Sequence, residues 1–136
     1  MDDTITISQF DKKRLLSLID GWEADPQDRG HIDDLVVELD RANVVEPTEI
    51  PPDVVTMNSR VRLTDIDAST TQTITIVFPG MANSDEGKIS ILAPLGTAIL
   101  GYRVGSVVEW NVPSGLRRLR IDAIEYQPEG AGDWKS

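Results

Sequence analysis

The sequence predicts an α+β protein, in which an N-terminal helical hairpin precedes an antiparallel sheet domain with one short helix. Over the first 50 residues, apolar side chains recur at spacings of three and four, as on one face of a helix. Beyond that point apolar and polar residues alternate, as along a strand. Pro47, Pro51 and Pro52 interrupt the chain between the two patterns, and a helix cannot run through them. We therefore expect two domains, at residues 1–50 and 51–136.

The N-terminal hairpin is expected to open with strand-like residues Thr4–Ile7 and with Ser8 as the N-cap of a helix. The first helix should span Ser8–Glu23, and a breaker-rich turn at Ala24–Gly30 should separate it from a second helix at Ile32–Asn43. The apolar faces consist of Leu15, Leu18, Ile19 and Trp22 on the first helix and Ile32, Leu35, Val36 and Leu39 on the second. Two such helices would pack as an antiparallel pair, a short coiled coil, because each then buries the apolar face of the other.

The strands after residue 51 are short, and turn residues separate them. The clearest is Thr73–Phe78, TITIVF, which a polar loop at Pro79–Gly87 follows. A short helix should begin at Pro94, since the missing N–H of proline has no partner at the first helical position, and should stop at Gly101. The other extended segments are expected at Val54–Val55, at Arg60–Leu63 after an Asn58–Ser59 turn, at Ile89–Leu92, and in a hairpin of Val107–Val112 and Leu116–Tyr126.

Composition and charge exclude several classes of function. The 136 residues carry a formal net charge of −10, which disfavours undirected binding to nucleic-acid phosphates. The acidity is concentrated in residues 1–50, with 13 acidic and 5 basic side chains. The absence of cysteine excludes disulfides, thiolate metal sites and cysteine catalysis. The acidic N-terminus does not resemble a signal peptide, and no apolar run reaches the length of a membrane span, so we expect a cytoplasmic protein that binds no membrane.

Three segments carry a resemblance to a known family. They are Asp53–Val61 (DVVTMNSRV), Ile89–Gly105, and Tyr126–Gly132 (YQPEGAG). In this order they resemble the bacterial Gre transcript-cleavage factors, and especially the smaller Rnk-type regulators of nucleoside diphosphate kinase. The resemblance implies an FKBP-like fold for the sheet domain. It also implies binding to core RNA polymerase at the entrance of its secondary channel, with nucleic acid reached only through the polymerase.

The resemblance also implies a docking loop. In Gre factors the loop matching Ile91–Leu95 contacts polymerase through an Asp-Ser-Pro-like stretch. Here Leu92 and Ala93 replace the acid and the hydroxyl, and Pro94 is retained. We therefore expect an apolar contact in this loop, with Leu92, Ala93, Pro94, Leu95 and Gly96 as candidates. The alternative is that Leu92 is simply a core residue.

The expected tip of the hairpin is acidic, with Asp20, Glu23, Asp25 and Asp28 close to the turn. In the cleavage factors, acids at the tip of a long coiled coil help to hold a catalytic metal. A 16-residue helix is only about 24 Å long, which makes a short arm. The alternative is a solvated tip whose acids stabilise the start of the second helix. We expect this alternative, and hence no catalytic residues, metal or cofactor and no stimulation of cleavage.

Other features are weaker indicators of function. His31 is the only histidine and has no nucleophile at a catalytic spacing. The cluster of Arg117, Arg118 and Arg120 could contact acidic polymerase or nucleic acid, but we favour pairing with the chain's own acids, such as Glu109 or Asp122. Alternation should place Arg118 and Arg120 on one face.

Two alternative functions remain open at this level. The FKBP-like fold suggests a prolyl isomerase, for which the sheet domain offers the aromatic residues Phe78, Tyr102, Trp110, Tyr126 and Trp134. Their irregular spacing argues against such a site. The hairpin could instead join two chains through Leu15, Ile19, Trp22, Val36 and Leu39. We expect a monomer that regulates transcription elongation without being an enzyme.

Overall fold

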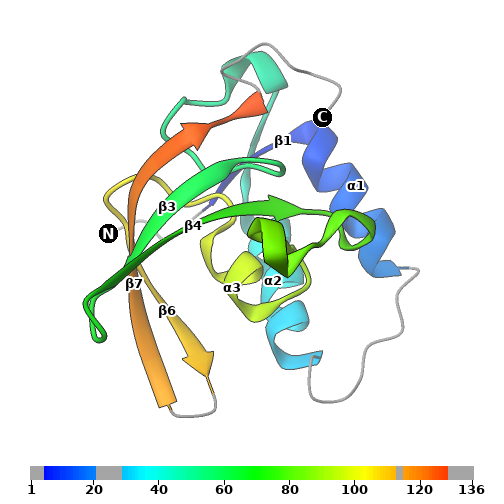
Figure 1. The fold of residues 1–136 in the computed structure, drawn as a ribbon. Coiled ribbons are helices and arrows are strands. Elements are labelled where there is room, and N and C mark those ends of the chain that lie inside the picture. The colour runs from blue at the N-terminus through cyan, green and yellow to red at the C-terminus, as the bar shows by residue number, and fades with distance from the viewer. Residues whose placement is uncertain (1–4, 21–28, 113–114, 129–136) are drawn as a thin grey trace.

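A computed structural model describes residues 5–20, 29–112 and 115–128. The N-terminal part contains β1 (Thr6–Ser8), α1 (Gln9–Asp20), α2 (Arg29–Arg41) and β2 (Asn43–Val45). The two short strands pair in parallel, at the ends of the helices farthest from the connection between them (Figure 1). Three helical turns follow farther along the chain, namely η1 (Pro47–Glu49), η2 (Pro79–Met81) and η3 (Ser84–Glu86).

Hydrogen bonds explain the start of α1 and the end of α2. The backbone N–H of Asp11 donates to Ser8 Oγ at 3.0 Å, so the predicted N-cap is confirmed. The second helix ends at Arg41, before the predicted Asn43. The reason is tertiary: the N–H of Asn43 donates to the carbonyl of Ile5 at 2.8 Å, which draws this residue into β2. Trp22 and Glu23 lie outside the described residues.

The main sheet has the strand order β5-β4-β3-β7-β6. Its strands are β3 (Arg60–Asp65), β4 (Thr70–Val77), β5 (Lys88–Ser90), β6 (Val107–Val112) and β7 (Gly115–Tyr126), and α3 (Pro94–Ile99) lies between β5 and β6 in the chain. The β3–β4, β3–β7 and β6–β7 pairs are antiparallel, as predicted. The β4–β5 pair is parallel, so the sheet is mixed: it is mostly antiparallel, as predicted, and its parallel pair was not predicted. The parallel pair arises because residues 78–87 contain two 3-10 turns and carry the chain back only as far as Thr75, which pairs with Lys88, whereas a tight hairpin would reverse the strand direction.

The segments that carried the family resemblance meet in the fold. The buried amide of Gln127 donates to the carbonyls of Pro51 and Val54 at 2.8 and 2.7 Å, so the residue that follows β7 holds the segment that leads toward β3. Val54 and Val55 form no strand, contrary to prediction, because Val54 makes only an isolated bridge with Arg103. The predicted turn at Asn58 is confirmed, with a positive φ of 66° that asparagine tolerates.

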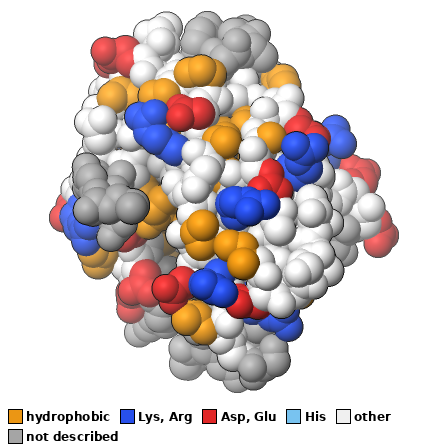
Figure 2. Space-filling view, turned by 90° about the vertical axis from the view of Figure 1, so that its left-hand side faces the viewer, with side chains coloured by type: hydrophobic (Ala, Val, Ile, Leu, Met, Phe, Trp, Pro, Cys, Tyr) orange, Lys and Arg blue, Asp and Glu red, His pale blue; other side chains and the backbone are white. Residues whose placement is uncertain are grey.

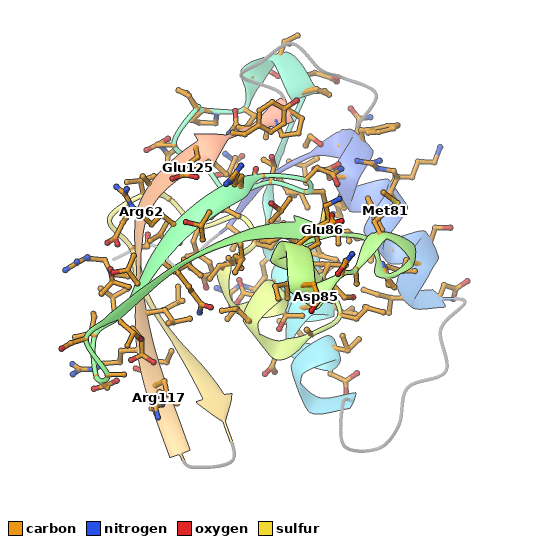
Figure 3. The ribbon with its side chains drawn as sticks, viewed as in Figure 1. Arg62, Met81, Asp85, Glu86, Arg117 and Glu125 are labelled. Carbon is orange, nitrogen blue, oxygen red and sulfur yellow. The ribbon has the colours of Figure 1, made fainter. Side chains whose placement is uncertain are left out.

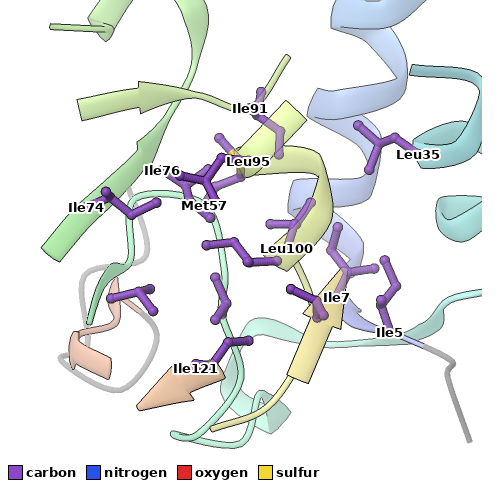
Figure 4. Close-up of a cluster of buried hydrophobic side chains, with 14 of the residues drawn as sticks. Ile5, Ile7, Leu35, Met57, Ile74, Ile76, Ile91, Leu95, Leu100 and Ile121 are labelled. Atoms are coloured by element: carbon purple, nitrogen blue, oxygen red, sulfur yellow. The ribbon is translucent and has the colours of Figure 1, made fainter. Parts of the chain in front are cut away.

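A single hydrophobic cluster joins the two parts of the chain (Figure 4). Ile5, Ile7 and Leu35 of the N-terminal part lie in the same cluster as Ile76 and Ile121 of the sheet. Of the predicted helix faces, Leu15, Ile32, Leu35 and Leu39 are buried within one chain, whereas Leu18, Ile19 and Val36 are half-buried. No helix in the described part of the chain is long and apolar enough to cross a membrane.

Candidate docking surface

The predicted docking loop is a compact turn built around Ser90. The N–H of Leu92 donates to Ser90 Oγ at 3.1 Å, and the N–H of Ala93 donates to the Ser90 carbonyl at 3.0 Å. Pro94 then opens α3 at its first position, as predicted, with Ala93 as the N-cap. Just before the turn, the N–H of Ile91 donates to the carbonyl of Val77 at 2.8 Å, so the loop is fastened to the end of β4.

The five candidate residues of this loop occupy different environments. Leu92 and Ala93 are half-buried, and Leu92 also packs against the core cluster. Leu95 is a core residue, 7% exposed (Figure 4). Gly96 is buried, and a Cβ there would lie 2.7 Å from the Ser90 carbonyl oxygen, so its role is to let α3 approach the backbone of the turn. The structure describes the backbone of Pro94 but not its side chain. Leu92 and Ala93 are thus the accessible candidates whose side chains are described.

The acidic tip falls mainly outside the described residues. Asp20 is exposed at the end of α1, whereas Glu23, Asp25 and Asp28 belong to residues 21–28, which are not described. Within the described ranges, no three acidic or histidine side chains come together in a way that could hold a metal ion. His31 lies in α2, and its side chain is not described.

The arginine cluster of β7 pairs with acids of the same chain, as we favoured. Arg117 contacts Asp65 at 3.3 Å, Arg118 contacts Asp67 at 3.0 Å, and Arg120 contacts Asp122 at 2.7 Å. Asp122 was a predicted partner, whereas Asp65 and Asp67 reach the cluster only because β3 pairs with β7. Figure 3 shows Arg117 and Glu125 toward opposite ends of this strand.

The hydrogen bonds and ion pairs of this cluster lower the pKa values of two of its acids, as expected for carboxylates beside cations. The hydrogen bond from Arg118 lowers the pKa of Asp67, and hydrogen bonds from Thr64 and Arg120 lower the pKa of Asp122. In Figure 2, positive and negative side chains lie next to one another over the visible face. Such a mixed surface is a poor electrostatic site for nucleic acid.

We did not predict from the sequence the contacts that Asp11 and Arg14 of α1 make with Met57 and Phe78, which we call the junction. The Asp11 carboxylate is only 2% exposed; it pairs with Arg14 at 2.5 Å and accepts the backbone N–H of Met57 at 3.4 Å. The Arg14 guanidinium lies 4.3 Å from the ring centroid of Phe10 and 4.7 Å from that of Phe78. Burial raises the pKa of Asp11, although Arg14 and the Met57 N–H act against that shift.

Only part of this junction had a signal in the sequence. The three-residue spacing of Asp11 and Arg14 is compatible with an ion pair on a helix. The contacts with Met57 and Phe78 depend on packing between segments that are far apart in the chain. Among the aromatic residues considered for an isomerase site, Phe78 contacts Arg14, and both Phe78 and Tyr102 pack against the core cluster. Tyr126 ends β7, Trp110 lies in β6 without a described side chain, and Trp134 lies outside the described residues.

Comparison with known proteins agrees with this architecture. Residues 50–126 match the family model described as "Transcription elongation factor, GreA/GreB, C-term", and residues 3–45 match "Rnk N-terminus". The regulator of nucleoside diphosphate kinase from Escherichia coli strain K12 is 39% identical over 134 residues, which cover 96% of each chain. Transcription elongation factor GreA from Nautilia profundicola is 37% identical over 78% of this chain and 68% of its own length.

A solved structure extends the similarity to three dimensions. The prokaryotic transcription elongation factor GreA/GreB from Nitrosomonas europaea superposes with a TM-score of 0.76 at 41% identity, and the match covers 92% of this chain and all of the other. The two family models together cover both the helical part and the sheet. The chain therefore belongs to the family of Rnk-type regulators of nucleoside diphosphate kinase, which share their C-terminal part with the GreA and GreB elongation factors.

Proposed function

We propose that this chain is a non-enzymatic transcription regulator that binds core RNA polymerase at the entrance of the secondary channel and competes there with Gre factors. The observation that carries the proposal is the match of residues 50–126 to the C-terminal part of the elongation factors, which includes the Ser90–Gly96 turn. The turn has a firm backbone and presents Leu92 and Ala93 at a partly accessible position. A rigid turn suits docking, since little order is lost when it binds.

In this proposal the sheet domain is FKBP-like and docks on the rim of the channel, while an antiparallel hairpin occupies the entrance as a short coiled coil. The monomer acts in the cytoplasm and meets nucleic acid only through polymerase. An effect on nucleoside diphosphate kinase would then be an indirect result of altered transcription. Neither a metal nor a cofactor of its own is required.

The docking loop can be tested by replacing Leu92 with a cation. We expect Leu92→Arg to weaken competition with a Gre factor for purified core polymerase about tenfold, which corresponds to about 1.4 kcal/mol. The long arginine stem can keep its apolar part on the core and extend its charge to the surface, so the fold should tolerate the change. The measurement is displacement of a fluorescent Gre factor by the wild type and the variant.

Leu116→Arg is the matched control. Leu116 is 57% exposed at the start of β7, so the substitution introduces the same charge outside the docking loop. Equal competition by all three proteins would leave polymerase as the partner but move the interface away from Leu92. Failure of the wild type to displace the Gre factor at micromolar concentration would contradict the proposed function itself.

We also expect the chain not to stimulate transcript cleavage. The 12 residues of α1 extend about 18 Å, which is short for an arm that has to carry acids from the rim to the active site. Stalled elongation complexes saturated with the chain should release no more cleavage product than complexes without it. A Gre factor added to the same complexes provides the positive control, and cleavage above background by this chain would show that its arm reaches the active site.

A further inference from the structure

The base of the helical part is tied to the sheet domain through β1. The N–H of Thr6 donates to the carbonyl of Gly101 at 3.1 Å, just after α3. The N–H of Asn43 donates to Ile5, so the end of α2 is fastened to the same place. These bonds hold the end of α1 that starts at Gln9. Farther along the helix, Leu15 packs in the core cluster, which is apolar and does not by itself select the polar partners of α1.

Asp11 and Arg14 supply contacts with the sheet domain farther along α1. Asp11 accepts the N–H of Met57, in the turn that leads into β3, and Arg14 stacks on Phe78, which follows β4. Arg14 lies six residues beyond the Ser8 cap, about 9 Å along the helix axis. The helix is thus held at two separated positions, and Figure 1 shows it beside the sheet domain.

The chemistry of these contacts favours one orientation of α1. An almost fully buried carboxylate requires charge and hydrogen-bond partners, because an unpaired buried charge is strongly unfavourable. Asp11 has Arg14 on its own helix but receives the Met57 N–H only when α1 lies against the sheet domain. Arg14 keeps its stacking on Phe10 in any orientation, whereas its stacking on Phe78 depends on the same docked position.

The junction also lies next to the docking loop. Val77 and Ser90 are register partners in the parallel β4–β5 pair, so the residues that follow them leave the sheet at the same end. Phe78 follows Val77, and the docking loop follows Ser90. The bond from the Ile91 N–H to the Val77 carbonyl joins the two segments.

We propose that Asp11, Arg14 and Phe78 form a latch that holds α1 in one orientation on the sheet domain, so that hairpin and docking loop are presented to polymerase as one preorganised unit. The proposal deepens the proposed function and rests on it for the partner. Ordering the hairpin before binding removes an entropic cost that would otherwise oppose association. Asp11, Arg14 and Phe78 are positioning residues, since they act through the direction of α1.

The absence of cysteine makes the orientation directly measurable. Spin labels at Ser17→Cys on α1 and Gln72→Cys on β4, both exposed, report the distance between helix and sheet by pulsed electron paramagnetic resonance. With the latch intact we expect one narrow distance distribution. Phe78→Leu keeps an apolar side chain but removes the aromatic face, and Arg14→Met removes the cation, so each should broaden or shift the distribution.

Arg60→Met is the matched control, because it breaks an exposed ion pair with Glu125 between β3 and β7 and leaves the junction intact. It should retain the narrow distribution, and Phe78→Tyr should restore it by returning an aromatic face. Near-ultraviolet circular dichroism of each labelled variant in solution, before the resonance measurement, identifies any variant that is unfolded. Unchanged distributions in folded Arg14→Met and Phe78→Leu would overturn the latch.

The same variants then enter the polymerase competition. We expect folded latch variants to compete several-fold less well than the wild type, although the docking turn itself is unchanged. A broadened distribution with full competition would overturn the role of the latch in binding. Because the distance measurement needs no polymerase, a wild type that fails to bind polymerase would contradict the proposed function while the latch is still decided by the spin labels.

Discussion

Gly101→Ala should lower the free energy of unfolding by about 3 kcal/mol, because it combines an unfavourable backbone conformation with a steric overlap. Gly101 has a φ of +82°, and a Cβ there would lie 2.5 Å from the Cβ of Ile5. The residue also donates to the Val55 carbonyl and accepts from Thr6, so any shift of its backbone disturbs the connection between the two parts of the chain. Urea unfolding followed by circular dichroism measures the change.

Two other glycines separate the contributions. Gly105 has a φ of +93° but open space where a Cβ would be placed, so Gly105→Ala should cost only about 1 kcal/mol. Gly80 has open space and no positive φ, so Gly80→Ala should change stability by less than about 0.5 kcal/mol. Equal losses for Gly101→Ala and Gly105→Ala would show that the close approach of Ile5 is not a constraint.

Arg14→Met should destabilise the protein by about 2–3 kcal/mol at pH 7.5, since it leaves the Asp11 carboxylate buried without its cation. This expected loss lies at or below the lower end of the range for breaking a buried ion pair, because the Arg14 side chain is 28% exposed. Asp11→Asn combined with Arg14→Met should recover part of the loss, because the remaining side chain is then neutral. The measurement is urea unfolding of the wild type and both variants.

The loss in Arg14→Met should shrink as the pH is lowered to 5. Burial already raises the pKa of Asp11 above its ordinary value of 3.8, and removal of Arg14 raises it further because two influences that lower it disappear. Between the unfolded and folded pKa values the folded state binds more protons, so this group's contribution to stability grows as the pH falls and is lost as the pH rises.

The lowered pKa values of Asp67 and Asp122 act in the opposite sense, since stability from these acids is lost as the pH falls. Both acids are present in the wild type and in Arg14→Met, so their effects cancel in the difference. A difference in unfolding free energy that stays constant from pH 7.5 to 5 would mean that Asp11 is not the group left without a partner.

The strand and helix patterns in the sequence predicted much of the fold. Alternation in TITIVF and in Leu116–Tyr126 predicted β4 and β7 and placed Arg118 and Arg120 on the exposed side, opposite the buried Leu119. Helical spacing predicted that Leu15 and Leu35 are buried. These predictions succeed because side-chain periodicity and burial are local consequences of backbone geometry.

The candidate docking site was predictable only as a segment. The resemblance located the turn after Ile91, but the sequence could not distinguish Leu95, which is in the core, from Leu92, which is partly accessible. The two residues are three positions apart on opposite sides of the start of α3. Their burial depends on how α3 packs on the sheet, and Gly96 permits that packing through its close approach to Ser90.

By itself the sequence determined the α+β class, the helices α1, α2 and α3, most strands of the main sheet, buried residues such as Leu15 and Leu35, and the family resemblance. The parallel pairing of β5 with β4, the diversion of Asn43 into β2 and the junction of Asp11 with Met57 were decided only by the tertiary structure. The physical reason is that periodicity reports which side of an element avoids water, whereas strand register and the partners of a buried charge depend on contacts between residues far apart in the chain. Asp11 and Met57 are 46 positions apart, and no local pattern records that they meet.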